Sequence, residues 1–376
     1  MDLEFNKEQQ LLKSSVQDFL KKESPMTVVR EMLSDEMGCS KKVWKKMAEL
    51  GWLGIVAPDE YEGLEGNLID LAIIMEEMGA ACFTSPFFST VISGIAVNEA
   101  GSEDQKKSIL PKMVDGKLIM TLATDESEAW FGSPHISTTA AEDGDNYVIN
   151  GTKLFVLNAH IADKIICLAR TSDGEKPEDG LTFFIVDGKA DGVTCHMLDT
   201  LANDKQNEVI FENVKVPKSS VLGEVGNAWD ALEKVKQFAS VAKSAESLGG
   251  LVSVLDMTAK YAKDRKQFGR PLGGFQVIAH YLADMMVDVD GSRVITYKAA
   301  WLLSKGLPAE KEVSMAKSFV SEASQRVTIN GHQIHGAMGF CDEHDMHLYY
   351  RNAKTTEMQF GDSDYHLEKV AVEIGL

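Results

Sequence analysis

The sequence predicts an α+β multidomain protein with an N-terminal helical domain, a central β-barrel or β-sandwich domain and a C-terminal four-helix bundle. Two observations support this prediction. Apolar residues recur with the period of an amphipathic helix up to about residue 115 and again after residue 226, but with a period of two between them. The 376 residues, 44% of them hydrophobic, are enough for several domains with sizeable cores. We expect the domains to cover residues 1–117, 118–223 and 224–376.

The N-terminal domain is expected to contain several helical segments punctuated by glycines. Ser102 is the predicted N-cap of the last one, because its hydroxyl can accept a hydrogen bond from a backbone N–H of the first helical turn. The segments are residues 8–22, 41–50, 68–81, an apolar stretch after Pro86, and 102–114.

The central domain is predicted from short runs of β-branched and aromatic residues separated by Asp-Gly, Asn-Gly and proline turns. Such runs are typical of strands in a compact β domain. They cover residues 147–151, 153–157, 164–170, 181–188, 193–198 and 208–216.

Four long amphipathic segments follow and predict the C-terminal bundle. The sequence contains neither a GxGxxG nor a GxxxxGK loop, so it gives no indication of a Rossmann or P-loop nucleotide site. A nucleotide cofactor would have to be bound in another way. The four segments are roughly residues 228–263, 274–304, 308–336 and 343–374.

The charge and the cysteines restrict the possible partners. A formal net charge of −19 argues against nucleic acid or an anionic membrane surface, because both are negatively charged. The N-terminal residues are charged, and no apolar run approaches the roughly 18 residues of a membrane span, so we expect neither a secretory signal nor a membrane segment. Five cysteines without a CxxC spacing indicate neither a disulfide framework nor a metal site. We expect a cytoplasmic protein.

Residues 262–281 combine a helical apolar pattern with Arg265, Gln267, Phe268 and Gln276. A guanidinium presents a planar fork of donors that suits phosphate oxygens. The glycine and proline that follow would end the helix and let the backbone approach a ligand closely. The alternative is an ordinary solvated helix end.

The run Arg-Lys-Gln-Phe-Gly-x-Pro, followed by Gln276, resembles the signature of the acyl-CoA dehydrogenase family. The helical–β–helical order also matches that family over essentially the whole chain. The resemblance implies that Arg265 and Gln267 meet the pyrophosphate of an FAD bound to a neighbouring subunit. It also implies that Phe268 packs near the adenosine end.

Two stretches in the β domain are similar to flavin-contacting segments of the family. Thr124 matches a threonine whose hydroxyl and backbone contact the pyrimidine side of the flavin, although the following loop, with Ser133, lacks the family's Pro and Gly-x-Gly-Ser run. Phe155, Val156 and Leu157 stand where the family has Trp-Ile-Thr. Phe155 can still supply an aromatic face, but Leu157 has no hydroxyl to offer near flavin N5.

Gln333, Gly336 and Ala337 resemble a family turn, Gln-x-x-Gly-Gly, that packs against the adenine end of a partner subunit's FAD. Small residues there allow a ligand or another chain to come close to the backbone. The alternative is a helix C-cap followed by a tight connection.

The sequence departs from the family at the catalytic base. The glutamate that removes the α-proton in many members aligns with Phe360, and the position used by a minority aligns with Ala239. Neither side chain can accept a proton. Glu246 and Asp362 are the candidates to replace the base; their alternative roles are a helix-face carboxylate paired with a lysine or arginine, and a helix N-cap.

The resemblance therefore implies an FAD-dependent acyl-CoA dehydrogenase that desaturates an acyl-CoA thioester at its α,β-bond, or performs a variant elimination with an atypical base. It implies an electron-transferring flavoprotein as redox partner and a homotetramer, or a heteromer with a related subunit. Two alternatives stay open: a catalytically incomplete subunit of a heteromeric dehydrogenase for bulky ring-containing thioesters, and a non-enzymatic scaffold.

Overall fold

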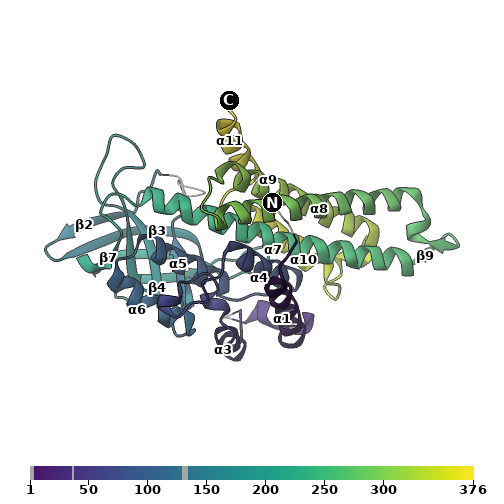
Figure 1. The fold of residues 1–376 in the computed structure, drawn as a ribbon, viewed down its shortest axis with the longest axis horizontal. Coiled ribbons are helices and arrows are strands. Elements are labelled where there is room, and N and C mark those ends of the chain that lie inside the picture. Colours follow the sequence, from purple (N-terminus) through teal and green to yellow (C-terminus); the bar gives the residue numbers. More distant parts are fainter. Residues whose placement is uncertain (1–3, 36–37, 129–133) are drawn as a thin grey trace. The chain divides into compact units, whose positions relative to one another are not determined.

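The computed structural model describes residues 4–35, 38–128 and 134–376 (Figure 1). The chain divides into two compact units. One consists of Met1–Glu31, Leu68–Phe83 and Gln237–Leu376, and the other of Met32–Asn67 and Thr84–Lys236. None of the helices formed by the described residues is both long and apolar enough to cross a membrane.

The unit of Met32–Asn67 and Thr84–Lys236 contains helices whose ends are set by local capping. Ser102 caps α6 as predicted: its hydroxyl accepts a hydrogen bond from the Gln105 N–H at 3.3 Å, and the Gln105 side chain accepts one from the Ser102 N–H at 3.0 Å. Helix α5 is apolar and buried along most of its length. The helices are α3 (Lys41–Glu49), α5 (Phe87–Ala100) and α6 (Glu103–Val114).

The same unit contains one eight-stranded sheet in the order β6-β7-β3-β2-β4-β5-β8, with β1 parallel to β4. The predicted strands 147–151 and 153–157 form a single strand, β3, because register shifts rather than a turn interrupt its pairing with β7. Strands β1, β2 and β8 were not predicted. The strands are β1 (Met120–Ala123), β2 (Thr139–Asp143), β3 (Asn146–Leu157), β4 (Lys164–Arg170), β5 (Leu181–Asp187), β6 (Val193–Met197), β7 (Gln206–Pro217) and β8 (Val221–Leu222).

The other unit is a helical assembly in which α9 packs against α8, α10 and α11, and α4 packs against α1 and α8. A two-stranded hairpin, β9 (Lys266–Gln267) and β10 (Arg270–Pro271), joins α7 to α8 (Figure 1). Its helices are α1 (Lys7–Glu23), α4 (Leu68–Ala80), α7 (Trp229–Asp264, of which residues 237–264 belong here), α8 (Gln276–Ser304), α9 (Glu310–His335), α10 (Met346–Met358) and α11 (Ser363–Glu373). Helix α2 (Met26–Ser34) continues from this unit into the other.

The expected single helix over residues 343–374 is wrong: the structure has α10 and α11 with a break between them. Phe360 and Gly361 adopt positive φ angles of 59° and 107°, which a right-handed helix cannot contain. A Cβ on Gly361 would lie 2.4 Å from Cδ1 of Tyr365, so the position also requires glycine for space. The break falls at the position where the sequence departs from the family's catalytic glutamate.

Candidate functional site

Phe155 is presented outward from the β domain by a bulge in β3. The pairing of β3 with β7 shifts register between Lys153 and Val156, and Phe155 has a φ of 57° there. Its side chain is 49% exposed, whereas Val156 is buried. Bulges and strained backbones of this kind re-aim side chains at functional sites. The exposed ring offers the aromatic face that a flat ligand would need.

A buried ion pair joins this strand to the predicted Thr124 segment. The ammonium of Lys153 is fully buried and lies 2.7 Å from Oε1 of Glu126 and 3.1 Å from the Thr124 carbonyl. Glu126 also accepts hydrogen bonds from the backbone N–H groups of Ser137 and Thr138. Burial alone would raise the pKa of Glu126, but Lys153 and these donors lower it to about 2.

The remaining predicted residues of this unit lie near the same strands. Thr124 is half-buried, and its hydroxyl is 3.3 Å from Oδ1 of Asp125. Leu157 is half-buried, and its carbonyl accepts a hydrogen bond from the Thr121 hydroxyl. Ser133 lies outside the described residues. The structure therefore brings the Thr124 and Phe155 segments together through Lys153, which sequence reasoning did not single out.

In the helical unit, the hairpin between α7 and α8 exposes the residues of the arginine motif. Phe268 is 93% exposed at the hairpin turn. The side chains of Arg265 and Gln267 are exposed and have no polar partner within the ranges that the structure describes. Gln276 is the exposed first residue of α8. A Cβ on Gly269 would meet nothing within 4 Å, so the turn is open to an approaching group.

The glycine turn after α9 lies at the same end of this unit as the hairpin. Tyr261, in the last turn of α7, stacks on His335 with 4.2 Å between ring centroids. Gln333 and Ala337 are exposed, and Gly336, with a φ of 61°, has open space where a Cβ would stand. His335 is buried and both of its ring nitrogens lack a partner among the described residues. Burial lowers the pKa of His335 to about 4, so the ring is neutral at neutral pH.

These features fit a dinucleotide that approaches this end of the unit from outside. Arg265 supplies an unpaired cation for phosphate, and open glycines at 269 and 336 allow close approach to the backbone. An apolar hollow of about 460 Å³ lies at the base of the hairpin. It is lined by Ala259, Ala262, Lys263, Pro271, Gly273, Ala279 and Leu282.

Phe360, which the resemblance aligns with the family's catalytic base, is half-buried in the break between α10 and α11. The amine of Lys317, on α9, lies 2.8 Å from the carbonyl of Glu357 and 2.8 Å from that of Gly361. Burial lowers the pKa of Lys317 to about 7, and in its neutral form the amine keeps two N–H donors, enough for both carbonyls. Sequence reasoning missed this lysine, because its partners lie 40 and 44 residues away.

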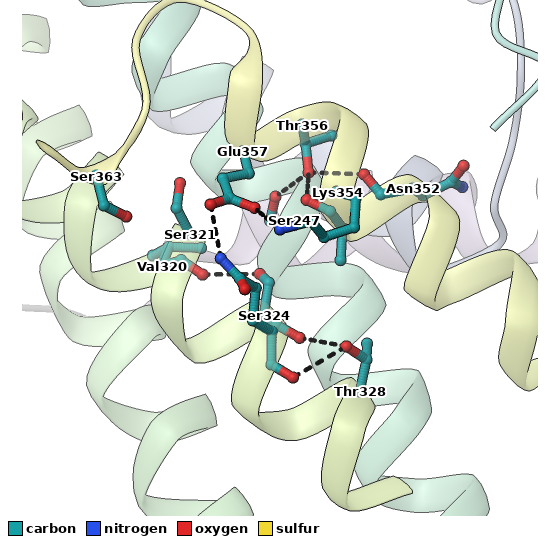
Figure 2. A network of polar contacts seen from close by, with 12 residues as sticks. Ser247, Val320, Ser321, Ser324, Thr328, Asn352, Lys354, Thr356, Glu357 and Ser363 are labelled. Atoms are coloured by element: carbon teal, nitrogen blue, oxygen red, sulfur yellow. Dashed lines mark hydrogen bonds and ion pairs between the residues drawn. The ribbon is translucent and has the colours of Figure 1, made fainter. Parts of the chain in front are cut away.

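The carboxylates near this break each have a partner. Glu357 is bound by Lys354 at 2.7 Å and by the Gln325 amide at 2.6 Å (Figure 2). Asp362 is the N-cap of α11, and its Oδ1 accepts a hydrogen bond from the Tyr365 N–H at 2.9 Å. Glu246 lies 2.7 Å from the ammonium of Lys243. Glu357 was not among the predicted candidates, although its place one turn before Phe360 could have suggested it.

Ala239 is completely buried on α7 and leaves no acid–base group at the second position that the family uses. Seven residues further along the same helix, Glu246 borders a small pocket of about 20 Å³, room for about one water. Ser247, Asn352 and Thr356 also line this pocket, and the Ser247 hydroxyl donates to that of Thr356 at 2.8 Å (Figure 2). Glu246 therefore borders the same small pocket as these hydroxyl and amide groups.

The β domain presents an outward-facing aromatic ring, and one end of the helical unit is suited to phosphate. These two features fit the class of proteins that bind a dinucleotide without a Rossmann or P-loop motif. Three domain models of one family match the chain: the acyl-CoA dehydrogenase N-terminal domain at residues 6–117, the middle domain at 124–214 and the C-terminal domain at 229–375. The chain belongs to the acyl-CoA dehydrogenase family.

Individual relatives and solved structures agree with this assignment. The chain is 31% identical to the caffeyl-CoA reductase-Etf complex subunit CarC of Acetobacterium woodii, with 96% of each chain covered. It is similar to the structure of butyryl-CoA dehydrogenase from Megasphaera elsdenii, with a TM-score of 0.92, 27% identity and all of both chains covered. It is also similar to the FAD complex of PigA, with a TM-score of 0.93, 25% identity and all of both chains covered.

The predicted family, fold class, cofactor and enzyme class are confirmed: the chain is an FAD-dependent oxidoreductase of the acyl-CoA dehydrogenase type. The comparisons give no support to the two alternatives, an incomplete subunit and a non-enzymatic scaffold. The domain boundaries at residues 117/118 and 223/224 and the roles of the individual site residues stay predictions.

Proposed function

We propose that the chain transfers two electrons between FAD and the C2–C3 bond of an acyl-CoA thioester, and that the proton at C2 is carried by Glu246 rather than by residue 360 or 239. The observation that supports this most directly is the break between α10 and α11, where Phe360 takes the place of the usual carboxylate. A phenyl ring cannot exchange a proton, so another group must do so.

Glu246 is the better placed of the two predicted candidates. It lies seven residues, about two helical turns, after Ala239 on α7, so both side chains project from the same face. Helical side chains tilt toward the helix N-terminus, so the Glu246 carboxylate extends back toward Ala239, as its contact with Lys243 also indicates. Asp362 is less suitable, because protonating it would remove the N-cap of α11.

The cofactor contacts follow from the family resemblance and, at the helical end, from exposed groups such as Arg265. When bound, FAD supplies the hydride chemistry at C3. Thr124, Phe155, Val156 and Leu157 would line the isoalloxazine ring from the β domain. The helical-end residues would hold the pyrophosphate and adenosine of an FAD bound mainly to a neighbouring chain; these are Arg265, Gln267, Phe268, Gln276, Gln333, Gly336 and Ala337.

The assembly and redox partner belong to the same proposal. Large apolar side chains are exposed on the helical unit, among them Phe268 at the hairpin, Val287 on α8 and Phe340 after α9. Such surface favours association with further copies or with a related subunit. The relative named as a subunit of a reductase-Etf complex supports an electron-transferring flavoprotein as the redox partner.

The direct test is anaerobic bleaching of the flavin by a straight-chain acyl-CoA, measured by stopped-flow absorbance across a pH series. Glu246→Gln should slow bleaching by about 10²–10⁴, the usual range for loss of a general base. Asp362→Asn serves as the comparison and should slow it far less. An unchanged rate in Glu246→Gln, with FAD content and melting temperature also unchanged, would assign the proton transfer to a different group or to a partner chain.

A complementary variant restores the missing carboxylate. Phe360→Glu should raise the bleaching rate with a straight-chain thioester, because it returns a base to the family's usual position. Burial and the nearby Asp362 should raise the pKa of the new carboxyl, so the rate should rise with pH over the range where that group ionises. A variant that keeps its FAD but shows no gain at any pH would contradict the placement of residue 360 at the thioester.

A further inference from the structure

The amine of Lys317 ties together the two sides of the helix break that carries Phe360. Lys317 projects from α9 into the interior and is 2% exposed. Its amine contacts the carbonyl of Glu357, three residues before Phe360, and the carbonyl of Gly361, the residue directly after it. The Ser321 hydroxyl, one turn further along α9, is the third contact at 3.2 Å. A single side chain therefore satisfies the Glu357 carbonyl, which the end of α10 leaves without a helical donor, and the Gly361 carbonyl in the break itself.

A second group holds the carbonyl between those two. Nε2 of His366 lies 3.0 Å from the Phe360 carbonyl, and Nδ1 lies 3.2 Å from the hydroxyl of Ser314. With the proton on Nε2, the ring donates to the carbonyl and accepts from the serine. Ser314 and Lys317 are three residues apart, so they share one face of α9. The carbonyls of residues 357, 360 and 361 are thus all fixed, directly or through His366, from this face.

This fixation bears on the conformation of residue 360. Phe360 has a φ of 59°, and a bulky residue in the left-handed region costs of order 1–3 kcal/mol. Such a conformation persists only where the surroundings hold it on several sides. Burying a lysine is also unfavourable, and a methionine would fill the same volume without that penalty. The amine is therefore there for its hydrogen bonds to the break rather than for packing alone.

We infer that Lys317 is a positioning residue, which sets the place of the residue-360 side chain against the acyl group of the substrate. The inference rests on the proposed function, because that function gives residue 360 its place at C2 of the thioester. Lys317 itself touches neither substrate nor cofactor in this role; it acts through the carbonyls on either side of Phe360.

The first test measures the break without any ligand. Lys317→Met keeps the length of the side chain and removes the donors. Hydrogen exchange of a peptide covering residues 357–363 should become at least about tenfold faster, because the break opens more often once the carbonyls of Glu357 and Gly361 lose their donor. Lys298→Met is the matched control: Lys298 forms a surface ion pair with Glu312 on α9, and its loss should leave exchange in this peptide unchanged. Unchanged exchange in Lys317→Met would overturn the inference.

The second test asks whether Lys317 acts through residue 360. The probe is S-butyl-CoA, a thioether that cannot be oxidised, and its Kd for the FAD-loaded protein is measured by calorimetry. Lys317→Met should weaken binding by about tenfold in the wild-type background, but by less than about threefold when Phe360→Ala is already present. Such non-additive effects in a double-mutant cycle show that two residues are coupled. Equal effects in both backgrounds would overturn the inference and leave Lys317 a general structural lysine.

The two tests separate failure of the inference from failure of its premise. If Phe360→Ala binds S-butyl-CoA as tightly as the wild type, residue 360 does not face the acyl group, and the proposed function is contradicted at this position. The hydrogen exchange result would still show whether Lys317 holds the break. Should Lys317→Met fail to fold, Lys317→Gln, which keeps an amide donor on a shorter stem, replaces it in both tests. Its exchange rate should lie between the wild-type rate and that of the peptide in the unfolded chain.

Discussion

At the residue scale, the buried Glu126–Lys153 pair shows how a charged residue acquires a structural role from its surroundings. Both side chains are almost wholly inaccessible, at 3% and 0% exposure. The desolvation cost of such a pair is offset only when further hydrogen bonds satisfy the carboxylate, as the N–H groups of Ser137 and Thr138 do here. The pair holds the Thr124 segment against the strand that presents Phe155.

Replacing this carboxylate should have a cost that depends on pH. Glu126→Gln should lower the free energy of unfolding by about 3–5 kcal/mol at pH 7, because it leaves the Lys153 ammonium buried without its counter-ion. The pKa of Glu126 is about 2 in the folded protein against 4.5 in the unfolded chain. Its contribution is therefore fully present above pH 4.5 and is lost as the pH falls through about 2.

Urea unfolding of both proteins at several pH values checks this prediction. The difference between wild type and Glu126→Gln should shrink steadily between pH 4.5 and pH 2. Glu142→Gln provides the control, since Glu142 pairs with Lys218 on the surface and should contribute no more than about 1 kcal/mol. A difference for Glu126→Gln that stays constant over this pH range would show that its pKa is not lowered.

The sequence allowed local features at this scale to be predicted, but not long-range partners. Ser102 could be predicted as an N-cap because both members of its capping box lie within four residues. Lys153 and Glu126 are 27 residues apart and meet only through the pairing of strands. Lys317 could not be connected to the break for the same reason: its contacts depend on how α9 packs against α10 and α11. His366 is only six residues from Phe360, but their contact depends on the turn made by the break, which was not predicted.

At the scale of elements, periodicity predicted most helices but not their interruptions. The amphipathic pattern runs through residues 359–362 without a proline, and it favoured one helix although Gly361 and the possible N-cap Asp362 are both signals of an interruption. In the β domain, the Asn-Gly pair at 150–151 was taken as a turn between two strands, whereas the structure accommodates it as an irregularity within β3. At the break, the positive φ of Phe360 decides the outcome, and propensity does not predict that conformation for phenylalanine. In β3, the register shift at the Asn-Gly pair falls at Gly151, and a second shift further along the strand contains Phe155.

The packing of α4 on α7 depends on glycines that permit close backbone approach. A Cβ on Gly249 would lie 1.7 Å from the carbonyl oxygen of Glu76, which belongs to the backbone and cannot move aside. Gly249→Ala should therefore lower the free energy of unfolding by about 1–3 kcal/mol, as overpacking does. The neighbouring Gly250→Ala should instead stabilise α7 by about 0.5–1 kcal/mol, because its Cβ would make ordinary contacts with Tyr349 at 3.7 Å and the Gly79 carbonyl oxygen at 4.0 Å.

Circular dichroism during urea unfolding measures both glycine variants, and their opposite signs are the informative result. The two substitutions add the same methyl group at adjacent positions of one helix, so they share any effect on helix propensity. Equal stabilisation by both would mean that α4 and α7 do not approach each other as closely as the structure has them.

At the scale of the whole molecule, the main constraint is a net charge of −19 on a protein that takes a cofactor with two phosphates. Overall electrostatics repel such a ligand, so its phosphates need local cations. Arg265 meets this requirement: it is exposed and has no ion-pair partner in the part of the chain that the structure describes. Arg265 could be predicted from its motif in the sequence. The position of the glycine turn at the same end of the helical unit, shown by the stacking of Tyr261 on His335, could be seen only in the structure.

Removing this cation should release the cofactor. Arg265→Ala should weaken FAD retention by about 1.5–3 kcal/mol, the usual contribution of charge-assisted hydrogen bonds to phosphate, or roughly 10- to 150-fold in affinity. Lys266→Ala, next to it in β9, changes the net charge by the same amount and should retain FAD far better, because a general loss of positive charge does not remove the bidentate donor.

The ratio of flavin to protein absorbance after gel filtration measures both variants, and the elution volume reports the assembly. The wild type should elute as an oligomer, because the proposed function has the FAD of one chain completed by the hairpin of another. Equal FAD content in wild type and Arg265→Ala would remove Arg265 from the cofactor site, and elution of the FAD-loaded wild type as a monomer would show that the hairpin serves no neighbouring chain.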